Sequence, residues 1–228
     1  MGGQACVFYG AAEFSRDTDI TVLSETENLA RLSEALDELQ AQCIAVPPFE
    51  AEYLKRGHAV HFRCQHSEAR NMRIDVMSVM RGVEPFDRLW TRRTTVEFEP
   101  GTLVELMSRI DLVTAKKTQR DKDWPMVRRL VEASYAQHRN KPDREHFEFW
   151  LQECRTPAIL LDLARKYPDE CGAAIENRPL LSHALAADET RLFEALDLEE
   201  KREREADRAY WAPLKAELEE LRRKRHRK

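Results

Sequence analysis

Apolar and polar residues alternate near the start of the chain, between residues 17 and 23. Asp17 and Asp19 occupy one set of alternate positions, and Ile20 and Val22 occupy the other. A period of two is typical of a half-buried β-strand, in which successive side chains point to opposite faces. The pattern therefore predicts a strand over 17–23 with two carboxylates on one face and the two apolar side chains turned to a core.

Two further apolar runs, over 58–65 and 72–79, predict a pair of antiparallel strands, because only a short polar segment separates them. In the second run Ile74 and Val76 face one side of the expected strand. Asp75, which lies between them in sequence, is therefore expected on the opposite side.

Helical periodicity accounts for most of the other segments in the first half. Leucines at helical spacing predict an amphipathic helix over about 27–42. Ser108 followed by Asp111 fits a capping box, which predicts a helix that starts there and runs to about Arg120. The remaining expected elements are a helix over 4–10 and a short strand near 102–107.

Beyond residue 123 the periodicity is helical throughout. The expected helices begin near 123 and continue over 143–154, 157–166, 169–176, 179–187 and a long charged segment, 189–224. Pro213 is expected to kink or restart the last one, because proline interrupts a helix ladder. The sequence thus predicts an α/β domain over 1–138, with a mixed sheet and flanking helices, and an all-helical region over 139–228.

Composition narrows the class of protein. Lys and Arg number 37 against 41 Asp and Glu, so there is no overall polycationic character, although basic residues gather at 222–228. That basic end is either a contact for RNA phosphates or a solvated helix end. The sequence has no secretory leader pattern and no apolar run long enough for a membrane. Five widely spaced cysteines without a C-x-x-C pair favour a cytoplasmic protein with free, mostly buried thiols.

The alternating segment near the N-terminus also suggests chemistry. Two carboxylates on one strand face repel each other unless they are solvated or share a cation such as Mg²⁺, which prefers oxygen ligands. Gly2 and Gly3 precede the first expected helix, where backbone N–H groups can approach a phosphate closely. A phosphate cradle beside metal-binding carboxylates is equipment for transferring a phosphoryl or nucleotidyl group.

The segment GGQACVFYG…SRDTDI resembles the opening motif of the nucleotidyltransferase superfamily, which has the polymerase-beta-like fold. The most similar branch includes the AbiEii-type toxins of bacterial toxin–antitoxin systems. In that family a third carboxylate lies on a neighbouring strand, and Asp75 in RIDVM occupies a matching place. A downstream K-x-x-x-x-R-x-K-D pattern is matched by Lys116, Arg120, Lys122 and Asp123.

The resemblance implies a nucleotidyltransferase-like mixed sheet and transfer of NMP from an NTP to a hydroxyl acceptor. Asp17, Asp19 and Asp75 would hold Mg²⁺, and crowding of the three acids without metal is expected to raise the pKa of at least one. Residues implied in nucleotide binding are Gly2, Gly3, Ser15, Arg16, Arg120, Lys122 and Asp123, with Lys116 implied in catalysis. Candidate acceptors are RNA, a protein hydroxyl or a small molecule, and a candidate partner is an antitoxin protein.

The chain departs from the family pattern in two places. A helix and a strand usually precede the glycine pair in the family and are not found in this sequence. Either the true start codon lies further upstream, or the sheet lacks a strand, in which case impaired phosphate binding and activity are expected. Met126 stands where related sequences often have another acid. The alternative function is a catalytically degenerate nucleotidyltransferase-fold module that binds or assembles.

Each candidate residue also has a structural interpretation. Asp75 could simply pair with Arg73 or Arg63 on the hairpin. Asp123 could be only the N-cap of the helix that follows it. The remaining alternatives are an exposed strand start for Asp17 and Asp19, a solvated helix face for Lys116, Lys117, Arg120 and Lys122, a plain loop position for Ser15, and a surface charge for Arg16.

Overall fold

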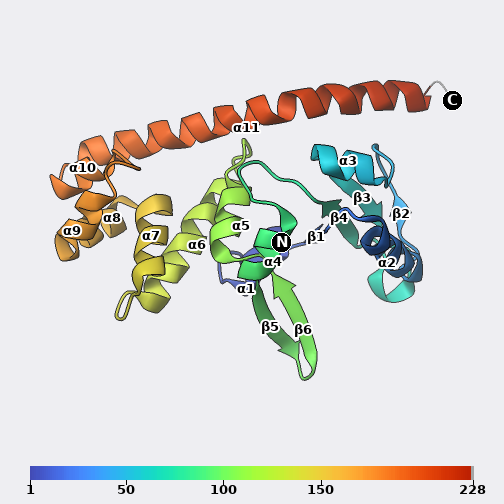
Figure 1. Cartoon of the computed structure of the whole chain (residues 1–228), viewed down its shortest axis with the longest axis horizontal. Helices are drawn as coiled ribbons and strands as arrows, with labels where there is room; N and C mark the ends of the chain where they lie inside the picture. Colours follow the sequence, from blue (N-terminus) through green and yellow to red (C-terminus); the bar gives the residue numbers. More distant parts are fainter. Residues whose placement is uncertain (227–228) are drawn as a thin grey trace. The chain divides into compact units, whose positions relative to one another are not determined.

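The computed structural model describes residues 1–226 of the chain (Figure 1). It is a mixed α/β protein with a small mixed sheet and many helices, and it ends in a long helix. Contacts divide it into two compact units. Unit 1 contains Met1–Phe8, Ala12–Ala115 and the chain from Ala209 onward, and unit 2 contains Tyr9–Ala11 and Lys116–Arg208.

This division differs from the predicted boundary between residues 138 and 139. The helix before that boundary, α6 (Asp123–His138), packs against α7 (Arg144–Glu153), which follows it. In this contact Tyr135 meets Trp150 edge to face, with ring centroids 5.0 Å apart. The all-helical character predicted for residues 139 onward is confirmed as far as residue 226.

Unit 1 contains a four-stranded sheet with the order β1-β4-β3-β2. β1 (Asp17–Thr21) runs parallel to β4 (Arg73–Met77), and β3 (Val60–Arg63) runs antiparallel to β4. The antiparallel pair predicted from the two apolar runs is thus confirmed. The short edge strand β2 (Gln42–Cys43), which pairs with β3, is not evident from the sequence pattern.

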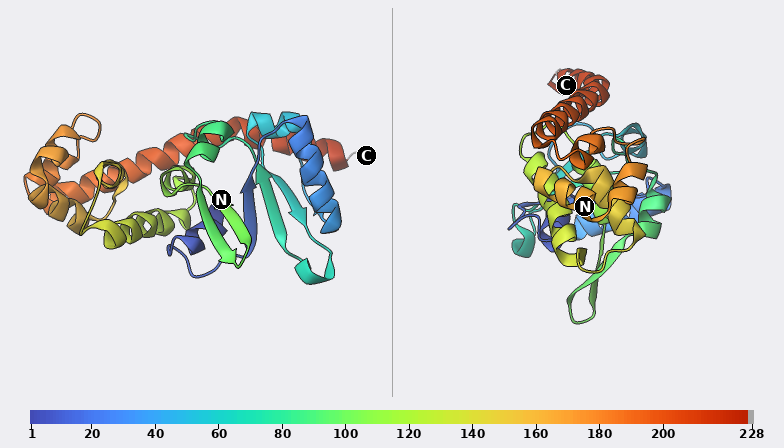
Figure 2. Two further views of the ribbon diagram at one scale, coloured as in Figure 1. Left: turned by 60° about the horizontal axis from the view of Figure 1, so that its bottom comes forward. Right: turned by 90° about the vertical axis from the view of Figure 1, so that its left-hand side faces the viewer.

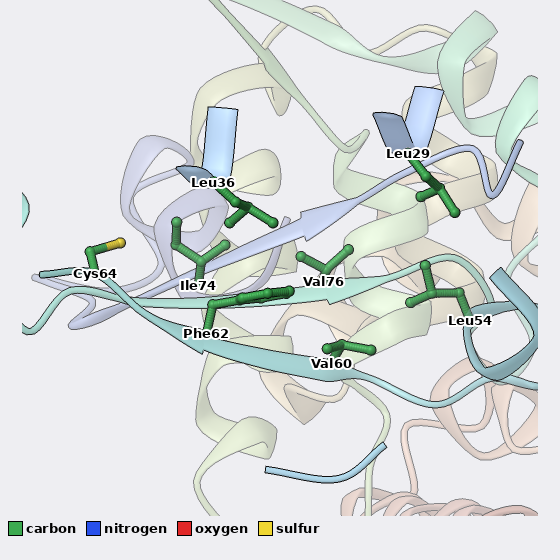
Figure 3. Close-up of a cluster of buried hydrophobic side chains, with 8 residues drawn as sticks. All are labelled: Leu29, Leu36, Leu54, Val60, Phe62, Cys64, Ile74 and Val76. Carbon is green, nitrogen blue, oxygen red and sulfur yellow. The ribbon is translucent and has the colours of Figure 1, made fainter. Parts of the chain in front are cut away.

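One face of this sheet carries the apolar core of unit 1 (Figure 3). Helix α2 (Thr26–Glu38) and helix α3 (Ala51–Arg56) cover that face. The core forms because alternate residues of β3 and β4 are apolar and point to the same side of the sheet. Its buried members are Leu29, Leu36, Leu54, Val60, Phe62, Cys64, Ile74 and Val76.

The other elements of unit 1 are short. Helix α1 (Gly2–Phe8) lies beside β1, and Gly10 follows it with a φ of 73°, as expected for the residue that ends a helix. A 3₁₀ turn, Ser67–Ala69, joins β3 to β4. Helix α4 (Phe86–Arg92) precedes the antiparallel pair β5 (Thr94–Glu99) and β6 (Thr102–Leu106), which forms a separate two-stranded sheet (Figure 2).

The helix predicted from the capping box is α5 (Arg109–Lys116). Ser108 Oγ accepts a hydrogen bond from the Asp111 backbone N–H at 3.1 Å, which confirms the cap. The predicted extension to Arg120 is wrong, because the backbone turns after Lys116. Residues 117–122 form an irregular segment that is held by side-chain hydrogen bonds.

Unit 2 is a helical bundle. After α6 and α7 come α8 (Pro157–Lys166), α9 (Pro168–Ala173) and α10 (Leu181–Leu185), followed by the first part of α11 (Glu189–His226). These match the predicted helices within a few residues at most ends. Large side chains close its interior, and those with almost no exposure are Trp124, Trp150, Leu130, Leu160, Leu163, Leu181 and Leu192.

Helix α11 continues through Pro213, so the predicted restart at that residue is wrong. The middle of α11, over residues 199–209, contains almost only charged residues and Ala, yet some of these side chains pack against the segment that follows α5. Asp207 is buried and accepts a hydrogen bond from the Gln119 backbone N–H at 2.8 Å. Arg204 donates to the carbonyl of Gln119 and to Asp121. Polar contacts thus replace the apolar stripe over this part of the helix.

The last part of α11 belongs to unit 1 and packs beside α3. Leu214 is buried, and Glu217 lies 2.7 Å from the Nε2 atom of the fully buried His58 and 2.9 Å from Arg56. Of the predicted basic end over 222–228, residues 227 and 228 lie outside the described residues. Arg223 and Lys224 pair along the helix with Glu219 and Glu220.

Two predictions from composition can be compared with the structure. Within residues 1–226 the five cysteines form no disulfide, and four of them are buried while Cys43 is exposed, as expected. Between residues 1 and 226 no helix combines the length and the apolar character needed to cross a membrane.

The contact between Glu217 and His58 gives a test of how α11 stabilises unit 1. Replacing Glu217 by Ala leaves the buried His58 ring without its carboxylate partner, so we expect the free energy of unfolding to fall by about 1–3 kcal/mol. Urea unfolding followed by circular dichroism measures this change. The matched control is Glu219→Ala, which removes only an exposed ion pair at 3.9 Å and should cost less than about 0.5 kcal/mol. Equal effects of the two changes would contradict the role of the buried contact.

Candidate active site

The face of the four-stranded sheet opposite the apolar core is acidic near β1 and β4. Asp19 is the register partner of Asp75, and Asp17 is the register partner of Arg73. Directly paired residues on neighbouring strands point to the same face, and so do residues two apart on one strand. Asp17, Asp19 and Asp75 therefore share one face of the sheet, as their parity in the sequence predicts. We call this surface, together with Arg73 and His61, the acidic face.

The glycine pair lies against the acidic face. The Gly3 backbone N–H donates to Asp19 Oδ2 at 3.2 Å, and the N-terminal amine of Met1 donates to the Asp19 carbonyl at 2.8 Å. Gly2 has a φ of 67°, and a Cβ atom built on it would lie 1.9 Å from Asp19 Oδ2. Position 2 therefore requires glycine for two reasons, the left-handed backbone and the close approach of the carboxylate.

The side chain of Ser15 packs on the glycine pair, whereas the side chain of Arg16 does not contact it. A Cβ atom on Gly3 would lie 2.4 Å from Ser15 Oγ, so the serine side chain packs directly on the glycine. Ser15 Oγ donates to the Asp17 carbonyl at 3.0 Å, which anchors the start of β1. Arg16 is exposed, with its guanidinium 6.0 Å from the ring centroid of Phe14. This placement agrees with a surface charge.

Asp75 is held by a pair of basic side chains on the same face. Arg73 Nε donates to Asp75 Oδ1 at 2.8 Å, and His61 Nδ1 lies 2.8 Å from the same oxygen. Arg73 Nη2 lies 3.2 Å from His61 Nδ1. The side chain of Asp75 is only 11% exposed. The pairing of Asp75 with Arg73, one of the alternatives open from the sequence, is thus present.

These contacts shift the pKa values of Asp75 and Arg73. Burial acts to raise the pKa of Asp75, but the hydrogen bonds and charges of His61 and Arg73 outweigh it, so the pKa lies below its usual value. The expectation that crowding would raise a pKa is therefore wrong for Asp75. The hydrogen bond to Asp75 raises the pKa of Arg73 against the effect of burial, and the charges of Asp17 and Asp19 add to this.

The acidic face fits a divalent cation in the kind of its donors but not in their present arrangement. Three carboxylates are suitable oxygen ligands for Mg²⁺. Among residues 1–226, however, no group of three or more His, Cys, Asp or Glu side chains is close enough together to hold a metal ion. One reason is that the Asp75 carboxylate is already engaged by Arg73 and His61.

The other predicted residues lie in unit 2 and form a second cluster of their own. Asp123 accepts hydrogen bonds from Thr118 Oγ1 at 2.6 Å, from Arg120 Nε at 2.7 Å and from Lys116 Nζ at 3.3 Å. Burial acts to raise the pKa of Asp123, but the charge of Lys116, the Thr118 hydroxyl and Arg120 outweigh it and lower the pKa. Lys122 is exposed beside this cluster.

This cluster corrects two expectations. Lys116 and Arg120 do not share a helix face, because α5 ends at Lys116; they meet instead through Asp123. The side chain of Asp123 is 1% exposed, so it orients the two cations and has no surface to offer a nucleotide. Lys116 is itself mostly buried, whereas the side chain of Arg120 is 55% exposed.

Two residues of the acidic face were not predicted as part of the site. The sequence indicated Arg73 only as a structural partner of Asp75, and it did not place His61 on this face. The signal for both is strand parity, since His61 is the register partner of Asp75 across β3 and β4. That register depends on the pairing of the strands, which the sequence of either strand alone does not define.

No protein-family model and no curated protein matches this chain. The function of the protein is therefore inferred from the geometry of the acidic face and from the sequence motif.

The packing of Gly2 on Asp19 predicts a specific sensitivity. Gly2→Ala places a methyl group where the Asp19 carboxylate lies, so we expect it to destabilise unit 1 by about 2–4 kcal/mol, from backbone strain and overlap together. Gly101→Ala is the matched control, because Gly101 has a φ of 81° and open space where its Cβ would be. Thermal unfolding of both variants separates the overlap from the strain. A loss for Gly2→Ala no larger than that for Gly101→Ala would contradict the close approach.

The cluster around Asp123 predicts a pH-dependent contribution to stability. Asp123→Asn leaves Lys116 without its buried partner and should lower the free energy of unfolding by about 3 kcal/mol at pH 7. The folded-state pKa of Asp123 is depressed, so its stabilising charge is present above the unfolded value of about 4 and is lost as the pH falls through the folded value. The difference between wild type and variant, measured by urea unfolding, should therefore shrink in acid.

Asp121→Asn provides the control for this test, because the Asp121 side chain is 98% exposed and carries the same charge. Its loss should cost at most about 1 kcal/mol. A pH-independent deficit for Asp123→Asn would show that its role is packing rather than charge.

Proposed function

We propose that this protein is a nucleotidyltransferase with a polymerase-beta-like core, which transfers NMP from an NTP to a hydroxyl acceptor. The observation that carries the proposal is the register of Asp19 against Asp75, with the Gly2–Gly3 backbone packed on Asp19. The order glycine pair, D-x-D strand and third Asp on a neighbouring strand is the order of the sequence motif. The downstream Lys/Arg/Asp pattern favours the AbiEii-type branch, and with it a toxin role.

The transfer is an attack by the acceptor hydroxyl oxygen on the α-phosphorus of the NTP. A new P–O bond forms, the bond between the α-phosphorus and the bridging oxygen breaks, and pyrophosphate leaves. The proton of the acceptor hydroxyl would pass to His61 or Asp75 on the acidic face. Asp17, Asp19 and Asp75 would hold Mg²⁺, which supplies charge neutralisation for the phosphate oxygens. The Gly3 N–H, which donates to Asp19 Oδ2, and the Ser15 hydroxyl, which packs on Gly3, would orient a phosphate beside Asp19.

In unit 2 the proposal assigns different roles to the residues of the Asp123 cluster. Arg120 has the exposed guanidinium, which is the group of this cluster that would contact a phosphate. Asp123 is a positioning residue for Arg120 and Lys116. This division follows from their exposures and replaces the contact of Asp123 with the nucleotide that the sequence pattern implied.

The alternative function, a degenerate module that binds without transferring, is supported by one observation. Asp75 is engaged by Arg73 and His61, so its carboxylate is not free as it stands. Both functions predict a nucleotide-binding fold, and they differ in whether an NMP group reaches an acceptor.

The first test is binding. We expect calorimetry to detect ATP, GTP, CTP or UTP only when Mg²⁺ is present, and Asp19→Asn to weaken this binding by at least about tenfold, because a neutral amide is a poor Mg²⁺ ligand. The amide oxygen can still accept from Gly3, so the fold should survive. Asp37→Asn, at an exposed position of α2, makes the same charge change and should bind normally.

The second test is transfer. Each NTP, labelled at its α-phosphate, is incubated with the protein and with RNA or cell protein, and label is sought on the acceptor. Binding without labelling of either acceptor would favour the degenerate module. No Mg²⁺-dependent binding of any NTP would overturn the proposed enzyme.

A further inference from the structure

We infer that two residues of α11, Arg204 and Asp207, are positioning residues for Arg120, because they fix the backbone of the segment 117–122 that carries its guanidinium. The inference rests on the proposed function in taking Arg120 as a contact for phosphate. All of these residues belong to unit 2. Neither Arg204 nor Asp207 belongs to the sequence motif, and both lie far from Arg120 in the chain.

The backbone of Gln119, the residue before Arg120, is engaged at both of its polar groups. Its N–H donates to Asp207 Oδ2 at 2.8 Å, and its carbonyl oxygen accepts from Arg204 Nη1 at 3.2 Å. The same nitrogen of Arg204 donates to Oδ1 of Asp121, the residue after Arg120, at 2.6 Å. Helix α11 therefore holds the chain on both sides of Arg120.

The two residues of α11 are themselves held in place by their own contacts. Asp207 is 2% exposed, so a movement away from the Gln119 N–H would leave a buried carboxylate without this donor. Arg204 is oriented by Glu200, whose Oε1 atom accepts from Nε at 3.1 Å and from Nη2 at 2.8 Å. The Arg204 guanidinium also lies 5.2 Å from the ring centroid of Trp124. Side chains fixed in this way can hold another group in a defined position.

The segment 117–122 depends on this support because it has no regular secondary structure between α5 and α6. Asp123 accepts from Arg120 Nε at 2.7 Å, yet the side chain of Arg120 remains 55% exposed. On a mobile backbone this guanidinium would have to be ordered when it binds a phosphate, and the lost conformational entropy would reduce the affinity. A backbone that α11 holds in advance avoids that loss.

The experiment measures binding of ATP, GTP, CTP and UTP with Mg²⁺ to the full chain by calorimetry. We expect Asp207→Ala to weaken binding about tenfold, as Arg120→Gln does, because a charge-assisted contact with phosphate is lost in both. Asp207→Asn keeps an oxygen that accepts from the Gln119 N–H, so its affinity should stay within about twofold of wild type. Arg204→Met removes the donors of Arg204 and should act like Asp207→Ala. In the double variant of Asp207→Ala and Arg120→Gln the losses should not add, because Asp207 acts through Arg120.

Leu196→Ala is the matched control for a general loss of stability. Leu196 is buried on the same helix, about 16 Å before Asp207 along its axis. Its truncation should lower the Tm at least as much as Asp207→Ala does, yet leave the affinity for NTP within about twofold of wild type. Equal weakening of NTP binding by Leu196→Ala would reduce the contacts of α11 to a structural role and overturn the inference. Fully additive losses in the double variant would also overturn it.

Limited digestion with trypsin distinguishes failure of this inference from failure of the proposed function, because it needs no ligand. Trypsin cleaves after Lys117, Arg120 and Lys122 only where the backbone opens locally. Asp207→Ala should therefore be cleaved in this segment several-fold faster than wild type, and Asp207→Asn should not. Faster cleavage together with no NTP binding by wild type would support the hold of α11 on the segment and remove the enzyme. Unchanged cleavage of Asp207→Ala would overturn the inference even where wild type binds NTP.

Discussion

Two carboxylates occupy directly paired positions on neighbouring parallel strands, and several groups of unit 1 compensate their charges. Asp19 and Asp75 are register partners on β1 and β4, so their side chains lie on the same face of the sheet. The surrounding groups each compensate part of the charge. Gly3 donates a backbone N–H to Asp19, and Arg73 and His61 engage Asp75. Each of the two carboxylates is thus paired with hydrogen-bond donors from neighbouring residues.

The same strands fix the core, and this couples site and stability. Ile74 and Val76 alternate with Asp75 on β4, and both are buried beneath α2 and α3. A slip of one residue in the β1–β4 pairing would turn the acids into the core and the apolar side chains to the opposite face. The apolar core therefore holds the acids in register, even though no carboxylate lies within it. Their repulsion is offset locally, by groups on their own face.

How much of this could be predicted from the sequence depends on the range of the interaction. Strand parity identified the face of Asp17, Asp19 and Asp75, because alternation is a local property of each strand. The helices of unit 2 were also evident from periodicity. The end of α5 was not, because residues 117–122 are held by side chains that gather at Asp123, and such contacts leave no periodic signal. Likewise, Arg73 and His61 became neighbours of Asp75 only through pairing across two strands.

The charge state of Asp75 bears on its role in the proposed transfer. A general base works best when its pKa lies near the working pH, whereas contacts with His61 and Arg73 hold the pKa of Asp75 below its usual value. A carboxylate of this kind is better suited to ligation than to accepting a proton from the acceptor hydroxyl. His61 is the neighbouring group on the same face, and its Nδ1 atom is oriented by Asp75 Oδ1. This orientation leaves the other ring nitrogen, Nε2, directed away from the carboxylate. In the proposed transfer Asp75 would then serve as a ligand, and the imidazole of His61 would take the proton of the acceptor hydroxyl.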